Sequence, residues 1–188
     1  MATASRTPDT SLLTGEAFAR LDIAERCELV AGRIVLMPPP PNYDHSEIVA
    51  NVCSLLHTFV KANQLGHVGA GEAGLYTEFD PDTVRGADVL FISNERRSQR
   101  DPEKTYLDVA PNLIVEVLSP SNHPADMIAK MREYFAIGVE LVWLVDPPMR
   151  RVQAHRSLTN AQVFNENDTL TADDILPGFA VRVVQFFE

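Results

Sequence analysis

The chain has 188 residues, 45% of them hydrophobic and 22% charged, which is ordinary for a globular protein and excludes a fibrous or largely disordered one. A chain of this length buries about 70% of the surface that its unfolded form exposes, so it can form a full core. The formal net charge of −10 repels nucleic acid at long range and argues against loose, sequence-independent coating of duplexes, although a divalent-metal site itself needs clustered carboxylates.

No segment suits a membrane protein or a disulfide-rich secreted one. The longest unbroken apolar run, at residues 141–145, is far shorter than the ~20 residues of a membrane-spanning helix. The N-terminus lacks the apolar stretch of a secretory signal. Cys27 and Cys53 lie in separate predicted elements without metal-ligand spacing, which is typical of small core residues. We therefore expect a cytoplasmic protein without a membrane partner.

The first predicted elements are short. Residues 1–13 lack apolar periodicity and are expected to form a loose tail, so that a single domain spans residues 14–188. A short helix is predicted over residues 14–21, with Thr14 as its N-cap. A β-hairpin follows over residues 27–37, because two apolar segments flank an Ala-Gly turn.

A long helix and two strands come next. Four prolines at residues 38–41 indicate a rigid, extended connection. An apolar stripe at helical spacing then predicts an amphipathic helix over about residues 44–64. A glycine-rich stretch at residues 66–74 precedes a strand at residues 75–79, and a further strand at residues 87–92 follows a short turn. This order predicts antiparallel pairing of the two strands.

The second half of the chain predicts a parallel pair of strands. A polar loop at residues 94–104 leads to an apolar run at residues 113–118, which is typical of a buried strand. A helix is predicted over residues 124–137, ended by Gly138, and a buried strand over residues 141–145. Because strand, helix and strand follow in that order, a crossover connection places the two strands side by side and parallel. Short β segments and a terminal element complete the chain.

Glu116 is a lone carboxylate inside one of these apolar runs. Burying an unpaired, ionised carboxylate costs several kcal/mol, so Glu116 is paired, protonated, bound to a metal or turned to the open face of its sheet. Asp88 lies in a second run of the same kind. Two such carboxylates are the ligands that Mg²⁺ prefers, together with water and phosphate oxygens. Lys130, on the helix after Glu116, can orient an attacking water or offset charge on the phosphorus.

A structural interpretation of the same residues stays open. Asp88 and Glu116 can equally be acids on solvent-facing positions of half-exposed strands. Lys130 is then an ordinary helix-surface residue beside Asp126 at i−4. Against this interpretation, residues 113–118 are apolar on both faces apart from Glu116, so a solvated face there would be almost entirely apolar.

Several motifs together resemble the Uma-type restriction endonuclease family, over about residues 21–187. The matching segments are ELVAGR at residues 28–33, RGADV at 85–89, NLIVEVLSPS at 112–121, the positions Asp126, Lys130 and Tyr134, and GVELVWLVDP at 138–147. Each motif alone is weak evidence, and their joint occurrence is specific. Two departures, Ala87 in place of a proline and Asn112 in place of a frequent aspartate, remove no proposed ligand.

That family is assigned to the PD-(D/E)XK nuclease superfamily. The resemblance implies an α/β (α+β) fold, a restriction-endonuclease-like mixed β-sheet flanked by helices, with the N-terminal hairpin and the long amphipathic helix added. It also implies a site that cleaves DNA phosphodiester bonds with Mg²⁺, for which Mn²⁺ is a possible substitute. By resemblance, Asp88 and Glu116 are the metal-binding catalytic acids. Lys130 replaces a lysine expected at position 118, where the chain has leucine, and Glu28 is an assisting acid.

Two further residues are weaker candidates for the site. His45, at the start of the long helix, either faces the site or is simply solvated. Arg85 either binds a phosphate or forms a structural salt bridge to a site acid. The leading hypothesis is a Mg²⁺-dependent endonuclease acting on DNA, and a homodimer would suit cleavage of a duplex. The alternatives are a non-catalytic nucleic-acid- or protein-binding module that keeps the fold, and a metal hydrolase acting on another phosphoester.

Overall fold

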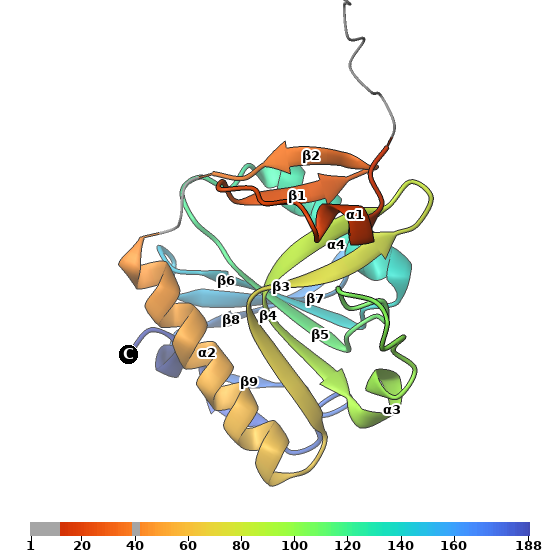
Figure 1. Cartoon of the computed structure of the whole chain (residues 1–188). Helices are drawn as coiled ribbons and strands as arrows, with labels where there is room; N and C mark the ends of the chain where they lie inside the picture. The colour runs from red at the N-terminus through yellow and green to blue at the C-terminus, as the bar shows by residue number, and fades with distance from the viewer. Residues whose placement is uncertain (1–11, 39–41) are drawn as a thin grey trace, which may run out of the picture.

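The computed structural model describes residues 12–38 and 42–188 (Figure 1). The expected tail over residues 1–13 and the proline run therefore lie largely outside the described residues. In chain order the elements are α1 (Gly15–Phe18), β1 (Cys27–Val30), β2 (Arg33–Leu36), α2 (Tyr43–Ala62), β3 (Gly66–Glu78), β4 (Thr83–Ser93), α3 (Asn94–Arg97), β5 (Leu113–Val117), α4 (Pro124–Ile137), β6 (Leu141–Asp146), β7 (Arg151–Ser157), β8 (Asn160–Asn165), β9 (Thr169–Thr171), β10 (Ala180–Arg182) and a 3-10 helix, η1 (Val183–Phe186).

A large mixed sheet organises these elements, as the resemblance implies. Its strand order is β2-β1-β4-β5-β6-β7-β8, and β3 pairs with the same strand, β4, that bridges β1 and β5. Every pairing in this sheet is antiparallel except that of β5 with β6, which is parallel from Leu113 opposite Leu141 to Val117 opposite Val145. The parallel pair joined through α4 confirms the predicted crossover.

Helices cover both faces of the sheet. On one face, α2 packs with the C-terminal segment against alternate residues of β5, namely Leu113, Val115 and Val117. On the other face, α4 packs against Ile114 and the neighbouring residues of β6. Because successive side chains of a strand point to opposite faces, Glu116 shares the α4-facing side with Ile114. The apolar residues on both sides of Glu116 thus serve two separate cores.

The predicted N-terminal elements are present. Thr14 caps α1 by accepting a hydrogen bond from the Ala17 N–H at 3.2 Å. The hairpin forms with Cys27 opposite Leu36, and α2 covers nearly the predicted residues, with Asn42 as its N-cap. Figure 1 shows the hairpin at one end of the molecule and α2 along the sheet. In the described part of the chain, no helix combines the length and the apolar character needed to cross a membrane.

The glycine-rich stretch differs from its predicted place outside the strand. It forms the first part of β3, a 13-residue strand paired along most of its length with β4. A Cβ atom at Gly66 would lie 2.1 Å from the Ile92 carbonyl oxygen, and one at Gly74 would lie 2.3 Å from the Tyr106 ring. Glycine here permits close approach of neighbouring chain segments, which is one of its recognised uses within strands. The expected loop after β4 also contains one helical turn, α3.

Candidate active site

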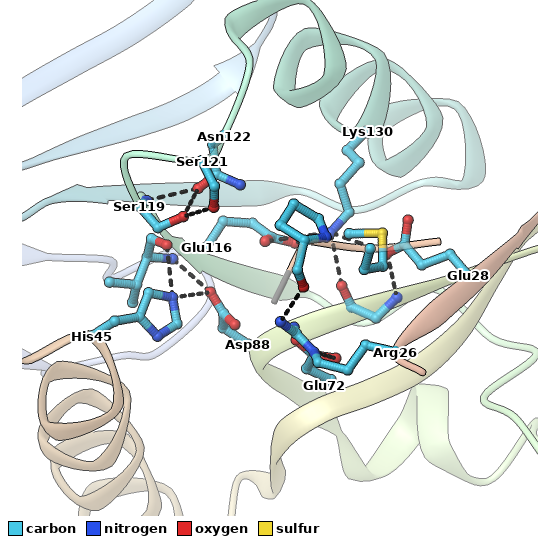
Figure 2. A pocket seen from close by; sticks show the side chains of 14 residues that line it. Arg26, Glu28, His45, Glu72, Asp88, Glu116, Ser119, Ser121, Asn122 and Lys130 are labelled. Carbon is cyan, nitrogen blue, oxygen red and sulfur yellow. Dashed lines mark hydrogen bonds and ion pairs between the residues drawn. The ribbon is translucent and has the colours of Figure 1, made fainter. Parts of the chain in front are cut away.

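One pocket lies where β1, β4 and β5 meet the start of α2 and the middle of α4 (Figure 2). Its lining includes an acid from each of the three strands, Glu28, Asp88 and Glu116, together with Lys130 from α4 and His45 from α2. The structure therefore brings five of the six predicted site residues to one place. Arg85, the sixth, lines an adjoining pocket and contacts the site through Glu28.

Asp88 joins the ends of β4 and β5. The regular ladder between these strands runs to Val89 opposite Val115, and just beyond it the Val117 N–H donates to Asp88 Oδ2 at 2.8 Å. His45 Nε2 lies 2.9 Å from the Val117 carbonyl oxygen and 3.5 Å from Asp88 Oδ2. The neighbouring Asp88 carboxylate raises the pKa of His45 and outweighs the opposing effect of partial burial. His45 thus faces the site and is not simply solvated.

Glu116 is buried and has two polar partners. Its side chain accepts a hydrogen bond from the Tyr134 hydroxyl at 2.7 Å, and Lys130 Nζ lies 3.2 Å from Oε1 and 3.5 Å from Oε2. Glu116 is only 5% exposed, so the solvent-facing interpretation is wrong for this residue. Burial raises its pKa, and the charge of Lys130 opposes that rise.

Lys130 is enclosed by the three strands that carry the acids. Its ammonium group donates to the Gly86 carbonyl at 2.8 Å and lies 3.4 Å from Glu28 Oε1. Burial alone would lower the pKa of Lys130, but the carboxylates of Glu116 and Glu28 together outweigh it, so the pKa is raised. Lys130 is therefore a buried cation among carboxylates, and the interpretation as an ordinary helix-surface residue is wrong.

Arg85 forms the structural salt bridges that sequence analysis left as one alternative. Its guanidinium binds both oxygens of Glu133, with Nε 2.7 Å from Oε2 and Nη2 2.5 Å from Oε1. Its Nη1 also donates to Glu28 Oε2 at 2.9 Å, while the other oxygen of Glu28 accepts the Gly86 N–H at 3.0 Å. Both oxygens of Glu28 thus accept hydrogen bonds from the protein. Glu28 therefore supports the site by holding Lys130.

Residues outside the predicted site set also line the pocket or support it. Tyr134, which the sequence indicates only as a position that matches the family, does not line the pocket but hydrogen-bonds to Glu116. It lies four residues after Lys130 on α4, and this helical spacing signals that both side chains share one face. The turn at residues 119–122 also borders the pocket, and Asn122 Oδ1 closes it by accepting the Ser119 N–H at 2.7 Å. Arg26 and Glu72 form an ion pair on the same pocket wall. No sequence spacing signals that pair, because it joins the residue that precedes β1 to an irregular position of β3.

The oxygen donors of the pocket suit a divalent cation that needs only one or two carboxylate ligands from the protein. Asp88 and Glu116 supply carboxylate oxygens, and Val117, whose carbonyl oxygen lies 2.9 Å from His45 Nε2, lines the same pocket. Within residues 12–38 and 42–188, no group of three or more His, Cys, Asp and Glu side chains forms a ready metal cage. Mg²⁺ is usually held by one or two carboxylates, with waters and substrate phosphate oxygens completing its octahedron. The donor set fits that mode and does not fit an all-protein cage.

Comparison with known proteins gives one family and one fold. The structure is similar to a solved structure from Anabaena variabilis described as "a putative nuclease belonging to DUF820", with a TM-score of 0.76 and 19% sequence identity over 93% of this chain and 97% of that chain. No curated protein matches the chain significantly. The profile of the Uma2 family, described as "Putative restriction endonuclease", matches residues 15–184, and the chain therefore belongs to this family.

Proposed function

We propose that the protein is a Mg²⁺-dependent endonuclease that hydrolyses DNA phosphodiester bonds. One observation carries this proposal: the Glu116 carboxylate and the Lys130 ammonium are buried 3.2 Å apart in a pocket that also contains Asp88. Keeping charged groups out of water is costly, and perturbed ionisable groups that converge in a cleft are typical of functional sites. Membership of a family described as "Putative restriction endonuclease", and a fold shared with a protein described as "a putative nuclease", support the same class of reaction.

The roles follow from the positions of the side chains. Asp88 and Glu116 would hold Mg²⁺, or Mn²⁺ as its substitute, in the pocket that both line. When bound, such an ion supplies Lewis-acid polarisation of a phosphoryl oxygen and acidifies water. Lys130 would orient the attacking water and offset negative charge at phosphorus. Glu28 assists by fixing the Lys130 ammonium, and Arg85 in turn fixes Glu28.

His45 would contribute at the other side of the pocket. Its imidazole lies between Asp88 and the Val117 carbonyl, and the raised pKa favours the protonated, cationic form. Together with Lys130 and Arg26, a protonated His45 would offset part of the negative charge of the four acids that line the pocket, Glu28, Glu72, Asp88 and Glu116. Attraction of a polyanionic substrate would thus depend on a bound cation, with little long-range steering by a protein whose formal net charge is −10.

A second candidate is a non-catalytic module that binds nucleic acid or protein and retains the fold. It is favoured by the completeness of the internal contacts, because Glu116, Lys130, Glu28 and Arg85 satisfy one another without any ligand. The strongly acidic net charge points the same way. A hydrolase acting on another phosphoester would use the same site.

The decisive experiment combines metal titration with cleavage assays. Calorimetric titration of Mg²⁺ and Mn²⁺ into the wild type should show binding that Asp88→Asn and Glu116→Gln abolish. The matched control Glu166→Gln, which removes an acid of an exposed ion pair, should bind metal like the wild type. Metal binding that Glu116→Gln leaves unchanged would overturn the proposed ligand set.

Cleavage of supercoiled and single-stranded DNA then separates the candidates. The endonuclease requires metal-dependent nicking by the wild type, lost in Lys130→Ala while metal still binds. Metal binding without cleavage of either DNA would instead favour the binding module. Hydrolysis of a simple phosphodiester without cleavage of DNA would favour the other phosphoester substrate.

A further inference from the structure

An apolar groove lies on the other side of the turn at residues 119–122, between α4 and the sheet. Its walls are formed by Met127 and Met131 of α4 and Leu144 of β6. Ile128 and Leu158 line it as well, and they are 46% and 40% exposed. Large apolar side chains that are exposed to water beside a concave apolar surface indicate a binding site.

His155 is the unusual residue of this groove. It lies on β7 opposite Val142, and it is only 8% exposed. Both ring nitrogens are buried without a hydrogen-bond partner in the described part of the chain. Buried polar atoms are nearly always paired, and leaving them unpaired destabilises a fold. Among the described residues, only the nearby backbone of Ser157 acts on this imidazole, and it does not reach hydrogen-bond geometry. A ligand that completes the hydrogen bonds is therefore the simplest reason for a histidine here.

The chemistry of the groove defines that ligand. Burial lowers the pKa of His155, and the nearby backbone of Ser157 opposes this only partly, so the imidazole is neutral. A neutral imidazole offers one donor and one acceptor. Gln153, two residues earlier on the same side of β7, adds an amide with both functions. The methionine sulfurs of the walls make favourable contacts with aromatic rings.

The groove also continues the candidate active site. Ser119 and Asn122 line both the carboxylate pocket and the groove, so only the turn at residues 119–122 separates them. A strand of DNA with a phosphodiester at Asp88 and Glu116 would therefore carry its adjacent base past this turn. An aliphatic side chain from a protein partner would match the apolar walls but leave the nitrogens of His155 unpaired.

We propose that the groove between α4 and β7 binds one unstacked nucleobase of the DNA strand being cut, with His155 and Gln153 hydrogen-bonded to the edge of the base. This inference rests on the proposed endonuclease function and adds a substrate preference to it. A base inside a duplex must first leave the stack, which costs a few kcal/mol, and a base in single-stranded DNA pays less. Single-stranded or distorted DNA is therefore the preferred substrate.

The test uses the full-length protein and a short single-stranded oligonucleotide that contains 2-aminopurine, whose fluorescence rises when it leaves the stack. Binding to the wild type without added divalent metal, which prevents cleavage of the oligonucleotide, should raise the fluorescence. His155→Leu should weaken binding about tenfold, as loss of one base contact does, and should suppress the fluorescence rise. This variant should fold, because it removes unpaired polar atoms from an apolar site.

Two further variants make the result specific. Gln153→Leu alters the partly exposed edge of the groove and should weaken binding in the same direction. His57→Leu, an exposed histidine of α2 outside the groove, should bind like the wild type. Wild-type affinity and fluorescence in both groove variants would overturn the base site while leaving the endonuclease proposal intact.

Other outcomes are equally decisive. If the wild type binds no DNA, single-stranded or duplex, the proposed function and this inference both fail. If the protein cleaves duplex DNA faster than single strands, only the base site fails. A dimer seen by light scattering without DNA, and dissociated by Ile128→Ser, would assign the groove to protein contact and overturn the proposal.

Discussion

Tyr134 donates its hydroxyl to Glu116 across 2.7 Å, and both side chains are buried between α4 and the sheet. The phenol is thus a fixed partner of the central acid of the candidate site. Burial and the neighbouring Glu116 raise the pKa of Tyr134 well above its ordinary value, so the hydroxyl keeps its proton and remains a donor. Lys130 contacts the same carboxylate from one turn earlier on α4.

Tyr134→Phe should lower the free energy of unfolding by about 1–3 kcal/mol, since it removes one hydrogen bond to a buried carboxylate and leaves the packing almost unchanged. Urea denaturation measures this loss. Tyr76→Phe is the matched control, because it removes a hydroxyl that bonds at 3.1 Å to Glu16, away from the site. A larger loss in the control than in Tyr134→Phe would contradict the importance assigned to the Glu116 contact.

Lys130→Met should destabilise the protein by about 3–5 kcal/mol, because it leaves the buried acids Glu116 and Glu28 without their shared cation. Adding Glu116→Gln to this variant should recover part of the loss, since one of the uncompensated charges is then gone. A double-mutant cycle by urea denaturation of the four proteins measures the coupling. Additive effects of the two substitutions would show that the pair does not act as a unit.

Arg85→Gln should cost about 3–5 kcal/mol of stability, since it removes the guanidinium shared by Glu28 and Glu133 in a region where Arg85 is 12% exposed. The control is Arg156→Gln, whose partner Asp174 is 61% exposed, and we expect little change there because water screens the pair. Thermal denaturation of both variants compares them directly. Equal shifts in Tm would mean that burial does not strengthen the Arg85 contacts.

Local sequence patterns predicted much of the fold and the position of the central acid. The apolar stripe of α2 and the strand-helix-strand order around α4 are periodicities within single segments, and the structure confirms both. The apolar residues on each side of Glu116 already argued against a solvated strand, because no face of β5 was left for water. The structure agrees, since all five residues of β5 are buried.

The polar partners of these residues could not be predicted in the same way. The partners of Arg85 are Glu28, from another strand 57 residues away, and Glu133, from α4, and only the assembled fold brings the three together. The unpaired nitrogens of His155 likewise have no trace in the sequence, where the residue stands in an ordinary strand pattern. The surroundings of both Arg85 and His155 depend on contacts between elements that are far apart in the sequence, which local patterns do not predict.

The glycine-rich start of β3 gives a further prediction from such a distant contact. Gly66→Ala should destabilise the protein by about 1–3 kcal/mol, because the new Cβ would lie 2.1 Å from the Ile92 carbonyl oxygen and the backbone must shift. Gly69→Ala lies in the same strand, and its Cβ would lie no closer than 3.4 Å to a neighbour, so it should be tolerated. Urea denaturation of both variants tests this contrast, and a loss in Gly69→Ala alone would contradict it.

The unpaired histidine predicts a pH dependence of stability. Burial lowers the pKa of His155 in the folded state below its ordinary value of 6.5, so the folded protein takes up this proton less readily than the unfolded chain. The contribution of the neutral imidazole to the free energy of unfolding is therefore fully present above about pH 6.5. It is lost as the pH falls below that value toward the pKa of the folded state.

His155→Leu has no imidazole at this position and should lose less stability than the wild type between pH 7.5 and pH 5. Urea denaturation at a series of pH values measures the difference between the two proteins, which cancels the titration of all other groups. His57→Leu is the control, because that exposed imidazole contacts water in both states. Parallel curves for wild type and His155→Leu would mean that His155 is protonated as easily in the fold as in water. A neutral His155, with one donor and one acceptor free, could then no longer be the group that meets a base.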